Sequence, residues 1–456
     1  MSGRARVIVP ALLAVLVVAA GTLLGGGIHL GVDPGATTAS TGGPSSGAGG
    51  SGGTGSTGGI AEPVTPAPTP TPRPSLGGTE LYGYLPYWQM TESMASYLKA
   101  SPVSTLLLFS VTSRKSGALN TTATGYRRIT GAVGRRLIAD AHHRKARVEL
   151  VFSSFGADKN ALLFGRAVPA PSPSPGASPA ATSAAPSPTA ILGSPVPSLP
   201  AGPAPWHRTV DELVALAVDL GVDGINVDVE TLDPLDRPVY GEFLAALRSA
   251  LRAALPDSRL TVATEAGQRG TANAAVASGA GVDRVFLMGY DYHWSGSQPG
   301  ASSPIDRLDG TATLRRSIDA YVEAGVPRDR IVLGLPLYGM QWRTDGVDRA
   351  SAVIGQGVTW IPNKHTDLLL APHFAPFRDW IEHAEYIVQP SDVGWLQTYY
   401  DSPATLRPKL ALALDNGLAG AGFWALGYER GLPGYVDLMR AFRDGKVERE
   451  ESPARP

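Results

Sequence analysis

The sequence predicts an α/β fold of the (β/α)8 barrel class, in which parallel strands alternate with helices. Eight strand-like runs follow one another within residues 79–443, and helical patterns separate them. One of these runs, Gly221–Glu230, carries a row of polar residues on one face. A doubly wound open sheet is the alternative, but no Gly-rich phosphate loop follows the first strand, which counts against it.

Each expected strand is a run of apolar, β-branched or aromatic residues between turn-forming or helical segments. In chain order the expected strands are Leu81–Trp88, Val103–Val111, Arg147–Ser154, Gly221–Glu230, Leu260–Thr264, Arg284–Tyr290, Ile331–Leu337 and Ala421–Leu426. The second of them is apolar almost throughout, as expected for a strand that is covered on both faces.

Helices are expected where apolar residues recur three or four positions apart. They span 130–144, 209–220, 240–255 and 314–324, followed by one that begins near residue 405 and one that closes at residue 442. Thr209 and Glu212 form a capping-box pattern that predicts the start of the second helix, and Gly221 predicts its end. Residues 340–398 are less regular, which indicates a long loop or a small insertion that walls a cleft.

Residues 1–30 read as a signal peptide or a membrane anchor, because Arg4 and Arg6 precede an uncharged run from Val7 to Leu30. Cleavage after small residues is the competing reading to an uncleaved anchor. Either reading places the rest of the chain outside the cytoplasm, anchored to the membrane or secreted. Residues 31–78, rich in Gly, Ser, Thr and Pro, are expected to be a disordered tether.

A Pro/Ala/Ser tract at residues 167–205 is expected to be a disordered insertion in a surface loop of the barrel. A domain boundary is the rival reading, but the pieces on either side complete a single β-α pattern only together. Residues 444–456 form a charged tail.

The composition limits the partners of this chain of 456 residues. Its formal net charge of −1 gives no sign of a nucleic-acid partner. The absence of cysteine excludes disulfides, thiolate metal sites and a thiol nucleophile. No His/Asp cluster has the spacing of metal ligands, so we expect no metal and no cofactor. We expect a monomer.

The polar row of the fourth strand is the strongest functional signal. Alternation along a strand points the side chains of Asn226, Asp228 and Glu230 to one face, and the β-branched residues between them to the other. Barrel enzymes place such inward polar groups at the carboxyl ends of their strands, where catalysis occurs. The alternative without a catalytic role is a solvated edge strand.

The segment Asp223-Gly-Ile-Asn226-Val-Asp228-Val-Glu230 resembles the Asp-x-x-Asp-x-Asp-x-Glu signature of glycoside hydrolase family 18. Three later segments resemble the same family, in the same order. They are Met288-Gly-Tyr290-Asp291 at the sixth strand, Leu333-Gly-Leu-Pro-Leu-Tyr338-Gly at the seventh and Gly422-Phe-Trp424-Ala-Leu-Gly at the eighth. The resemblance covers about residues 80–440.

One position departs from the signature, because many chitinases of the family have Asp where this chain has Asn226. The Asn form is similar to the bacterial branch of the family that contains spore-cortex and cell-wall hydrolases. Chitin and peptidoglycan both remain open as substrates.

The resemblance implies a role for each motif residue. Glu230 would be the general acid and later the base for water, and Asp228 would hold the acetamido N–H of the substrate. Tyr290 would donate to the acetamido oxygen, and Asp291 would bind a sugar hydroxyl. Trp424 would be the floor on which a sugar ring stacks. For Tyr290 and Trp424 the alternative is a purely structural role, as aromatic residues that fill the core.

Asn226, Tyr84 and Tyr338 complete the expected substrate-binding set, although barrel packing explains the two tyrosines about equally well. The first functional hypothesis is a retaining, substrate-assisted hydrolase that cleaves β-1,4-linked N-acetylglucosamine in peptidoglycan or chitin. The alternative is a non-catalytic module of the same family that only binds these glycans. The presence of Glu230 favours the enzyme.

Overall fold

The structure, a computed structural model, describes residues 78–168 and 203–447. They belong to a compact unit that begins at Ser75. The expected signal peptide or anchor, the tether up to residue 77, most of the insertion and the last residues of the tail lie outside the described residues. Among the described helices, none combines the length and the apolar character that a membrane span requires.

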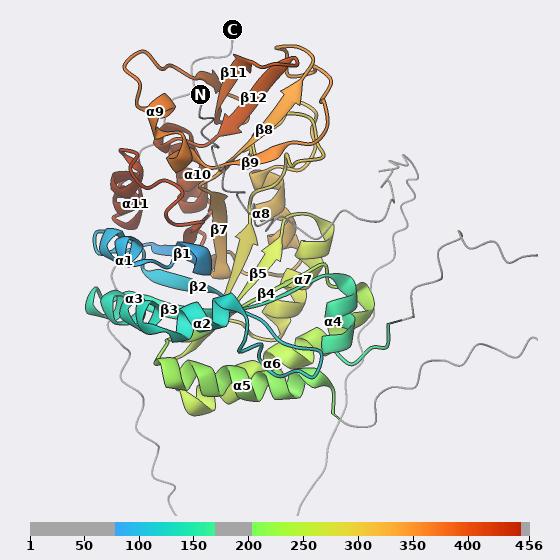
Figure 1. The fold of residues 1–456 in the computed structure, drawn as a ribbon. Helices are drawn as coiled ribbons and strands as arrows, with labels where there is room; N and C mark the ends of the chain where they lie inside the picture. Colours follow the sequence, from blue (N-terminus) through green and yellow to red (C-terminus); the bar gives the residue numbers. More distant parts are fainter. Residues whose placement is uncertain (1–77, 169–202, 448–456) are drawn as a thin grey trace, which may run out of the picture. The chain divides into compact units, whose positions relative to one another are not determined.

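Within the described residues, eight parallel strands close into a barrel in the order β1-β13-β7-β6-β5-β4-β3-β2. The strands are β1 Glu80–Pro86, β2 Thr105–Val111, β3 Arg147–Phe155, β4 Gly224–Glu230, β5 Arg259–Glu265, β6 Arg284–Met288, β7 Ile331–Pro336 and β13 Gly420–Trp424. Each falls within about three residues of an expected strand. The closed barrel confirms the predicted fold class and is incompatible with the open-sheet alternative (Figure 1).

The helices occupy the intervals between the strands. They are α1 Glu92–Leu98, α2 Thr124–Thr130, α3 Ala132–His143, α4 Ala157–Leu163, α5 Pro205–Leu220, α6 Arg237–Ala254, α7 Gln268–Gly279, α8 Leu314–Glu323, α9 Thr366–Leu369, α10 Pro403–Asp415 and α11 Tyr435–Arg443. The helix expected at 130–144 corresponds to α3, and α2 precedes it with Gly131 between them. The sequence patterns missed α1, α2, α4, α7 and α9. Of these, α1, α2 and α4 have seven residues each, and α9 has four.

The expected start of α5 was wrong. The helix begins four residues earlier at Pro205, whose fixed φ suits the first helical position. Thr209 is therefore inside the helix, where its buried hydroxyl donates to the carbonyl oxygen of Gly117 at 2.7 Å. Glu212 accepts a hydrogen bond from the backbone N–H of Leu119 instead of closing a capping box. The expected end is confirmed, because Gly221 is left-handed with φ 65°.

The less regular region after β7 is a second, antiparallel sheet in the order β10-β11-β12-β8-β9. Its strands are β8 Gly339–Thr344, β9 Val358–Trp360, β10 Phe377–Asp379, β11 Ala384–Pro390 and β12 Trp395–Tyr400. In Figure 1 this sheet, in orange, is separate from the barrel strands. The small insertion that the sequence indicated is therefore a sheet, and its strands of three to seven residues are too short for a clear periodic signal.

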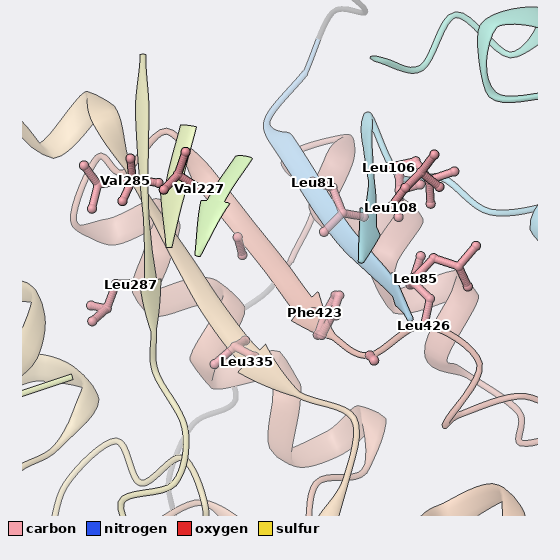
Figure 2. Close-up of a cluster of buried hydrophobic side chains, with 14 of the residues drawn as sticks. Leu81, Leu85, Leu106, Leu108, Val227, Val285, Leu287, Leu335, Phe423 and Leu426 are labelled. Carbon is pink, nitrogen blue, oxygen red and sulfur yellow. The ribbon is translucent and has the colours of Figure 1, made fainter. Parts of the chain in front are cut away.

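The apolar core of the barrel has two parts, one on each side of the barrel wall, and a smaller third cluster lies in the second sheet, at Trp360, Ile387 and Tyr400. Between the strands and the helices lies a large cluster, part of which is drawn in Figure 2 with Leu81, Leu106, Val227 and Phe423. Inside the barrel lies a smaller cluster that is rich in aromatic residues: Tyr82, Tyr84, Leu107, Phe109, Val151, Ala263, Phe286, Met288 and Val332. The barrel interior is thus filled by side chains and is a packed core, not a pore.

Candidate active site

Strand β4 presents its polar row to the inside of the barrel. Val227 and Val229 belong to the cluster between strands and helices, so the alternating residues face the opposite way. Asn226 and Asp228 are buried, with 0% and 4% of their surfaces exposed, whereas Glu230 at the end of the strand is half-buried. The row therefore rises from the packed interior to the carboxyl end of the barrel.

Asn226 is held in a chain of hydrogen bonds across the barrel interior. Its Oδ1 accepts from the hydroxyl of Tyr84 at 3.0 Å, and its Nδ2 donates to Oγ1 of Thr261 at 2.8 Å. The hydroxyl of Thr261 in turn donates to Oε2 of Glu149 at 2.5 Å. Tyr84, predicted to bind substrate, is 2% exposed and acts here as a buried partner of Asn226.

Asp228 and Glu230 are carboxyl groups that tend to keep a proton. Burial raises the pKa of Asp228 well above its usual range, and the charges of Glu230 and Glu265 add to this. Burial also raises the pKa of Glu230 to about 7, with further contributions from Glu265 and Asp291. Asp228 Oδ1 is buried and makes no hydrogen bond to the described residues. Near neutral pH this pair can therefore hold a proton and give it up.

Glu265 is a carboxylate of the site that the sequence reasoning missed. It ends β5, next to β4, and its Oε1 accepts from the backbone N–H of Thr231 at 3.0 Å. Its Oε2 is buried without a hydrogen-bond partner among the described residues. The available signal was an acid directly after the expected strand Leu260–Thr264, at the end where barrel enzymes place functional groups.

Glu149 was also missed, and it lies deeper in the barrel. It is fully buried on β3, and burial raises its pKa to about 7. The hydrogen bond from Thr261 and the charges of Arg147 and Arg259 oppose this rise, whereas the charge of Glu80 adds to it. An acid between the apolar residues Val148 and Leu150 of an expected strand was the signal that the sequence offered.

Tyr290 and Asp291 follow β6, separated from it by Gly289. Burial raises the pKa of Tyr290 well above its usual range, and the neighbouring Tyr338 and the charge of Asp228 contribute next. The charge of Asp228 thus disfavours ionisation of the Tyr290 hydroxyl, and the raised pKa means that this hydroxyl keeps its proton. The rings of Tyr290 and Tyr338 meet edge to face at 6.1 Å. The hydroxyl of Tyr338 donates to Oδ1 of Asp291, a residue that is exposed to solvent.

Trp424 ends β13 as a half-buried member of the aromatic cluster inside the barrel. Its ring lies 5.4 Å from the ring of Tyr84, 4.7 Å from that of Phe109 and 6.4 Å from that of Trp88. The structure thus brings Trp424 together with Tyr84, which is bonded to Asn226. The partial exposure of Trp424 leaves part of its ring free to meet a ligand.

Two other polar residues have structural roles. Asp223 lies before β4, where its Oδ2 accepts from the backbone N–H of Val148 at 2.8 Å and bonds Nε2 of His142. His293 is buried, and its Nδ1 bonds the carbonyl oxygen of Gln298 at 2.8 Å. Within residues 78–168 and 203–447, no group of His, Asp or Glu side chains is arranged to hold a metal ion.

A carboxyl pair with raised pKa values, a tyrosine and a half-buried indole thus lie at or near the carboxyl ends of β4, β6 and β13, at one end of the barrel. One carboxyl group can donate a proton, and the other can face a positive charge or an N–H group. These are the elements that cleavage of a glycosidic bond needs when the substrate supplies its own nucleophile. The sequence-predicted residues Asn226, Asp228, Glu230, Tyr290 and Trp424 are all part of this arrangement.

Residues 204–429 match the family model "Glycosyl hydrolases family 18". This interval runs from the start of α5 to just beyond β13, so it includes Asn226, Asp228, Glu230 and Trp424.

Curated relatives carry related names. A cortical fragment-lytic enzyme of Bacillus anthracis is 23% identical over 235 residues, which are 48% of this chain and 50% of that protein. Chitinase 1 of Aphanocladium album is 29% identical over 231 residues, which are 46% of this chain and 53% of the chitinase. This chain thus spans about half the length of the curated relatives that it matches.

The fold also matches solved structures. A family 18 N-acetylglucosaminidase from Paenibacillus barengoltzii aligns with a TM-score of 0.60 at 17% identity, over 80% of this chain and 99% of that one. At this identity the match supports the fold alone.

Proposed function

This chain belongs to glycosyl hydrolases family 18, and on that basis we propose that it hydrolyses β-1,4-linked N-acetylglucosamine glycans, either peptidoglycan or chitin. The observation that carries the proposal is the inward face of β4, where Asp228 and Glu230 follow each other with raised pKa values. The names of the relatives, a cortical fragment-lytic enzyme and a chitinase, support both substrates.

The reaction uses the N-acetyl group of the substrate as the nucleophile. The acetamido oxygen attacks the anomeric carbon while the bond from that carbon to the leaving oxygen breaks. Glu230, whose pKa of about 7 keeps it substantially protonated near neutrality, gives its proton to the leaving oxygen. Water then attacks the anomeric carbon, Glu230 takes a proton from it, and the acetamido group is released. Two inversions at one carbon give net retention.

Asp228 accepts the acetamido N–H and stabilises the positive charge that develops on this group. Its Oδ1 is suited to this contact, because it is buried and receives no hydrogen bond from the described residues. The hydroxyl of Tyr290 donates a hydrogen bond to the acetamido oxygen, and this bond aligns the oxygen for attack. Asp291, exposed to solvent and bonded to Tyr338, accepts a sugar hydroxyl, and Trp424 stacks under the sugar ring.

The substrate, a glycan of a cell wall or of chitin, is outside the cytoplasm. We therefore retain the proposal that residues 1–30 direct the chain out of the cytoplasm, as a cleaved signal or as an anchor. Alkaline carbonate extraction of membranes tests the anchor. A mature form found only in the soluble fraction would contradict it.

The test of the activity is Glu230→Gln, which keeps the size and hydrogen-bonding capacity of the side chain but removes the transferable proton. We expect hydrolysis of an N-acetylglucosamine oligomer to fall by at least about 10³-fold while oligomer binding, measured by calorimetry, remains. The matched control is Glu323→Gln, because Glu323 is exposed on α8 and should leave the rate unchanged.

Unchanged hydrolysis by the Glu230→Gln variant would refute the assignment. Wild-type protein that binds oligomers for days without cleaving them would instead support the non-catalytic alternative. Parallel digestion of peptidoglycan and chitin, with products identified by mass spectrometry, separates the two substrates. Proton NMR of the first-formed anomer tests retention.

A further inference from the structure

A buried hydrogen-bond relay lies directly below the proposed catalytic residues. It runs from Glu149 on β3 through Thr261 on β5 to Asn226 on β4, and from there to Tyr84 on β1. All four side chains are at most 2% exposed. The proposed reaction does not use Glu149, so its presence in the barrel interior needs another explanation.

The barrel is built so that Glu149 can reach Thr261 although β4 lies between their strands. Glu149 pairs with Gly224 on β4, and Gly224 pairs with Arg259 on β5. No side chain can stand at position 224, because a Cβ there would lie 2.3 Å from the carbonyl oxygen of Arg259. The absent side chain leaves the path across β4 open for the carboxylate of Glu149.

The relay has a direction because a threonine hydroxyl carries one proton. Thr261 donates that proton to the carboxylate of Glu149, so its oxygen can only accept from Asn226. Asn226 must therefore turn its NH2 group to Thr261 and its carbonyl oxygen to Tyr84. The opposite amide orientation would set the carbonyl oxygen of Asn226 against the lone pairs of Thr261.

We infer that Glu149 is a positioning residue that acts through Thr261: it fixes the amide orientation of Asn226 and makes a hydrogen-bond donor necessary at position 226. An aspartate there would put a carboxylate oxygen against the lone pairs of Thr261. It would also add a second negative charge close to Glu149, inside the barrel. Asparagine is thus the residue that this particular interior requires.

The orientation of Asn226 affects the next residue of the row. Tyr84 is close enough to Asp228 for the charge of Asp228 to be the largest effect on its pKa after burial. Because Oδ1 of Asn226 accepts the hydrogen bond of the Tyr84 hydroxyl, this hydroxyl does not donate to Asp228. Asp228 Oδ1 stays free for a ligand. This catalytic consequence rests on the proposed function, whereas the direction of the relay does not.

The test is a double-mutant cycle of Asn226→Asp and Glu149→Gln, measured near pH 8, above the pKa of Glu149. A glutamine at position 149 can either accept from Thr261 or donate to it, so Glu149→Gln alone should leave kcat within about threefold of wild type. Asn226→Asp alone should lower the melting temperature by several degrees and kcat by roughly tenfold or more.

In the double variant, the new glutamine can donate to the Thr261 hydroxyl, and that hydroxyl can then donate to the new aspartate. We therefore expect the double variant to melt higher than the Asn226→Asp single variant and to recover most of its kcat. Equal losses from Asn226→Asp in both backgrounds would overturn the relay. If the single variant does not fold, a folded double variant supports the relay, and an unfolded one counts against it.

Two matched variants identify the cause of any rescue. Glu80→Gln removes another acid of the barrel interior, one that bonds Arg259 and Arg284 but not Thr261, and it should not rescue Asn226→Asp. Thr261→Val removes the hydrogen-bonded intermediary and leaves only the repulsion between the two charges, so the coupling between positions 149 and 226 should become much smaller in that background. Rescue by Glu80→Gln, or coupling of undiminished size without the Thr261 hydroxyl, would contradict the inference.

The readouts keep this inference separate from the proposed function. The melting temperatures report the relay whether or not the protein is a hydrolase. Wild-type protein without hydrolytic activity would refute the proposed function and leave the stability cycle as the test of the relay. If Glu149 had a purely structural role, Glu149→Gln would raise only the melting temperature of the Asn226→Asp variant, whereas positioning predicts that it also restores the kcat of that variant with little change in KM.

Discussion

The charge of Glu265 acts on Glu230 more than any other neighbouring charge, and burial is the one larger influence on the Glu230 pKa. Both raise this pKa, and a general acid loses activity as the pH rises through its pKa. Replacing Glu265 by glutamine removes the charge but keeps an oxygen for the N–H of Thr231. We expect the basic limb of the pH–kcat profile to move to lower pH by roughly half a unit or more.

The control for this prediction is Glu242→Gln, since Glu242 is exposed on α6 and should leave the profile unchanged. A basic limb that stays in place, or moves to higher pH, in the Glu265→Gln enzyme would show that Glu265 does not set the protonation of Glu230.

The hydroxyl of Tyr290 can be tested apart from its ring. Tyr290→Phe keeps the edge-to-face contact with Tyr338 but removes the proposed donor to the acetamido oxygen. Loss of one such donor typically costs about 10²-fold in kcat, and we expect that loss with little change in KM. Steady-state kinetics on a chromogenic N-acetylglucosamine oligomer would measure both constants.

Tyr292→Phe is the matched control, because the Tyr292 hydroxyl bonds Oγ of Ser317 on α8 at 2.7 Å and has no proposed contact with substrate. It should leave kcat unchanged. Equal kcat values for the Tyr290→Phe and wild-type enzymes would remove Tyr290 from the mechanism and leave it as a barrel-filling aromatic residue.

At the scale of the elements, the glycine in the middle of β13 sets how closely the strand can approach the aromatic cluster inside the barrel. A Cβ at Gly422 would lie 2.6 Å from a ring carbon of Phe286 and 2.7 Å from Cβ of Tyr82. Gly422→Ala should therefore destabilise the protein by about 1–3 kcal/mol through overpacking. Urea unfolding followed by tryptophan fluorescence measures this change.

Gly279→Ala is the opposite case, since Gly279 ends α7 and a Cβ there meets nothing within 4 Å. Alanine favours the helix, so we expect a gain of up to about 1 kcal/mol. If the two substitutions shift the unfolding midpoint in the same direction by similar amounts, the packing argument at β13 fails.

At the scale of the whole molecule, the strands, helices and proposed site all lie in the compact unit that begins at Ser75. We expect a chain of residues 75–456 to unfold at the same temperature as the full chain and to keep its kcat on soluble oligomers. Differential scanning calorimetry and oligomer kinetics would check this. A lower melting temperature or a lost activity would mean that the first 74 residues contribute to the folded unit.

How far the sequence predicted the fold depended on the strength of each local signal. The run Ile331–Leu337 is continuous and apolar, and the structure confirms it as β7 to within one residue. The short strands β9 and β10 have three residues each, which is too few for alternation to be recognised. At α5 the capping-box pattern at Thr209 competed with Pro205, and the fixed φ of proline determined the start.

In the candidate site, too, some residues could be predicted from a local pattern and others depended on how the strands pair. Asn226, Asp228 and Glu230 are consecutive inward positions of a single strand, so their common face followed from the period of two residues. Glu265 and Glu149 are on β5 and β3, and their distance from β4 depends on how the strands pair in the barrel. Tyr84 was predicted as a substrate contact. Its buried hydrogen bond to Asn226 could not be predicted from the sequence, because it depends on where β1 lies in the closed barrel.

By itself, the sequence determined the barrel class, the polar face of its fourth strand and the chemical types of the residues placed there. Hydrophobic periodicity and residue chemistry are local properties, and a linear chain displays them directly. Only the tertiary structure decided which acids surround Glu230 and in which direction the hydrogen bonds of Asn226 run. Both depend on strand register and on the closure of the barrel, which bring together groups as far apart in the chain as Glu149 and Thr261.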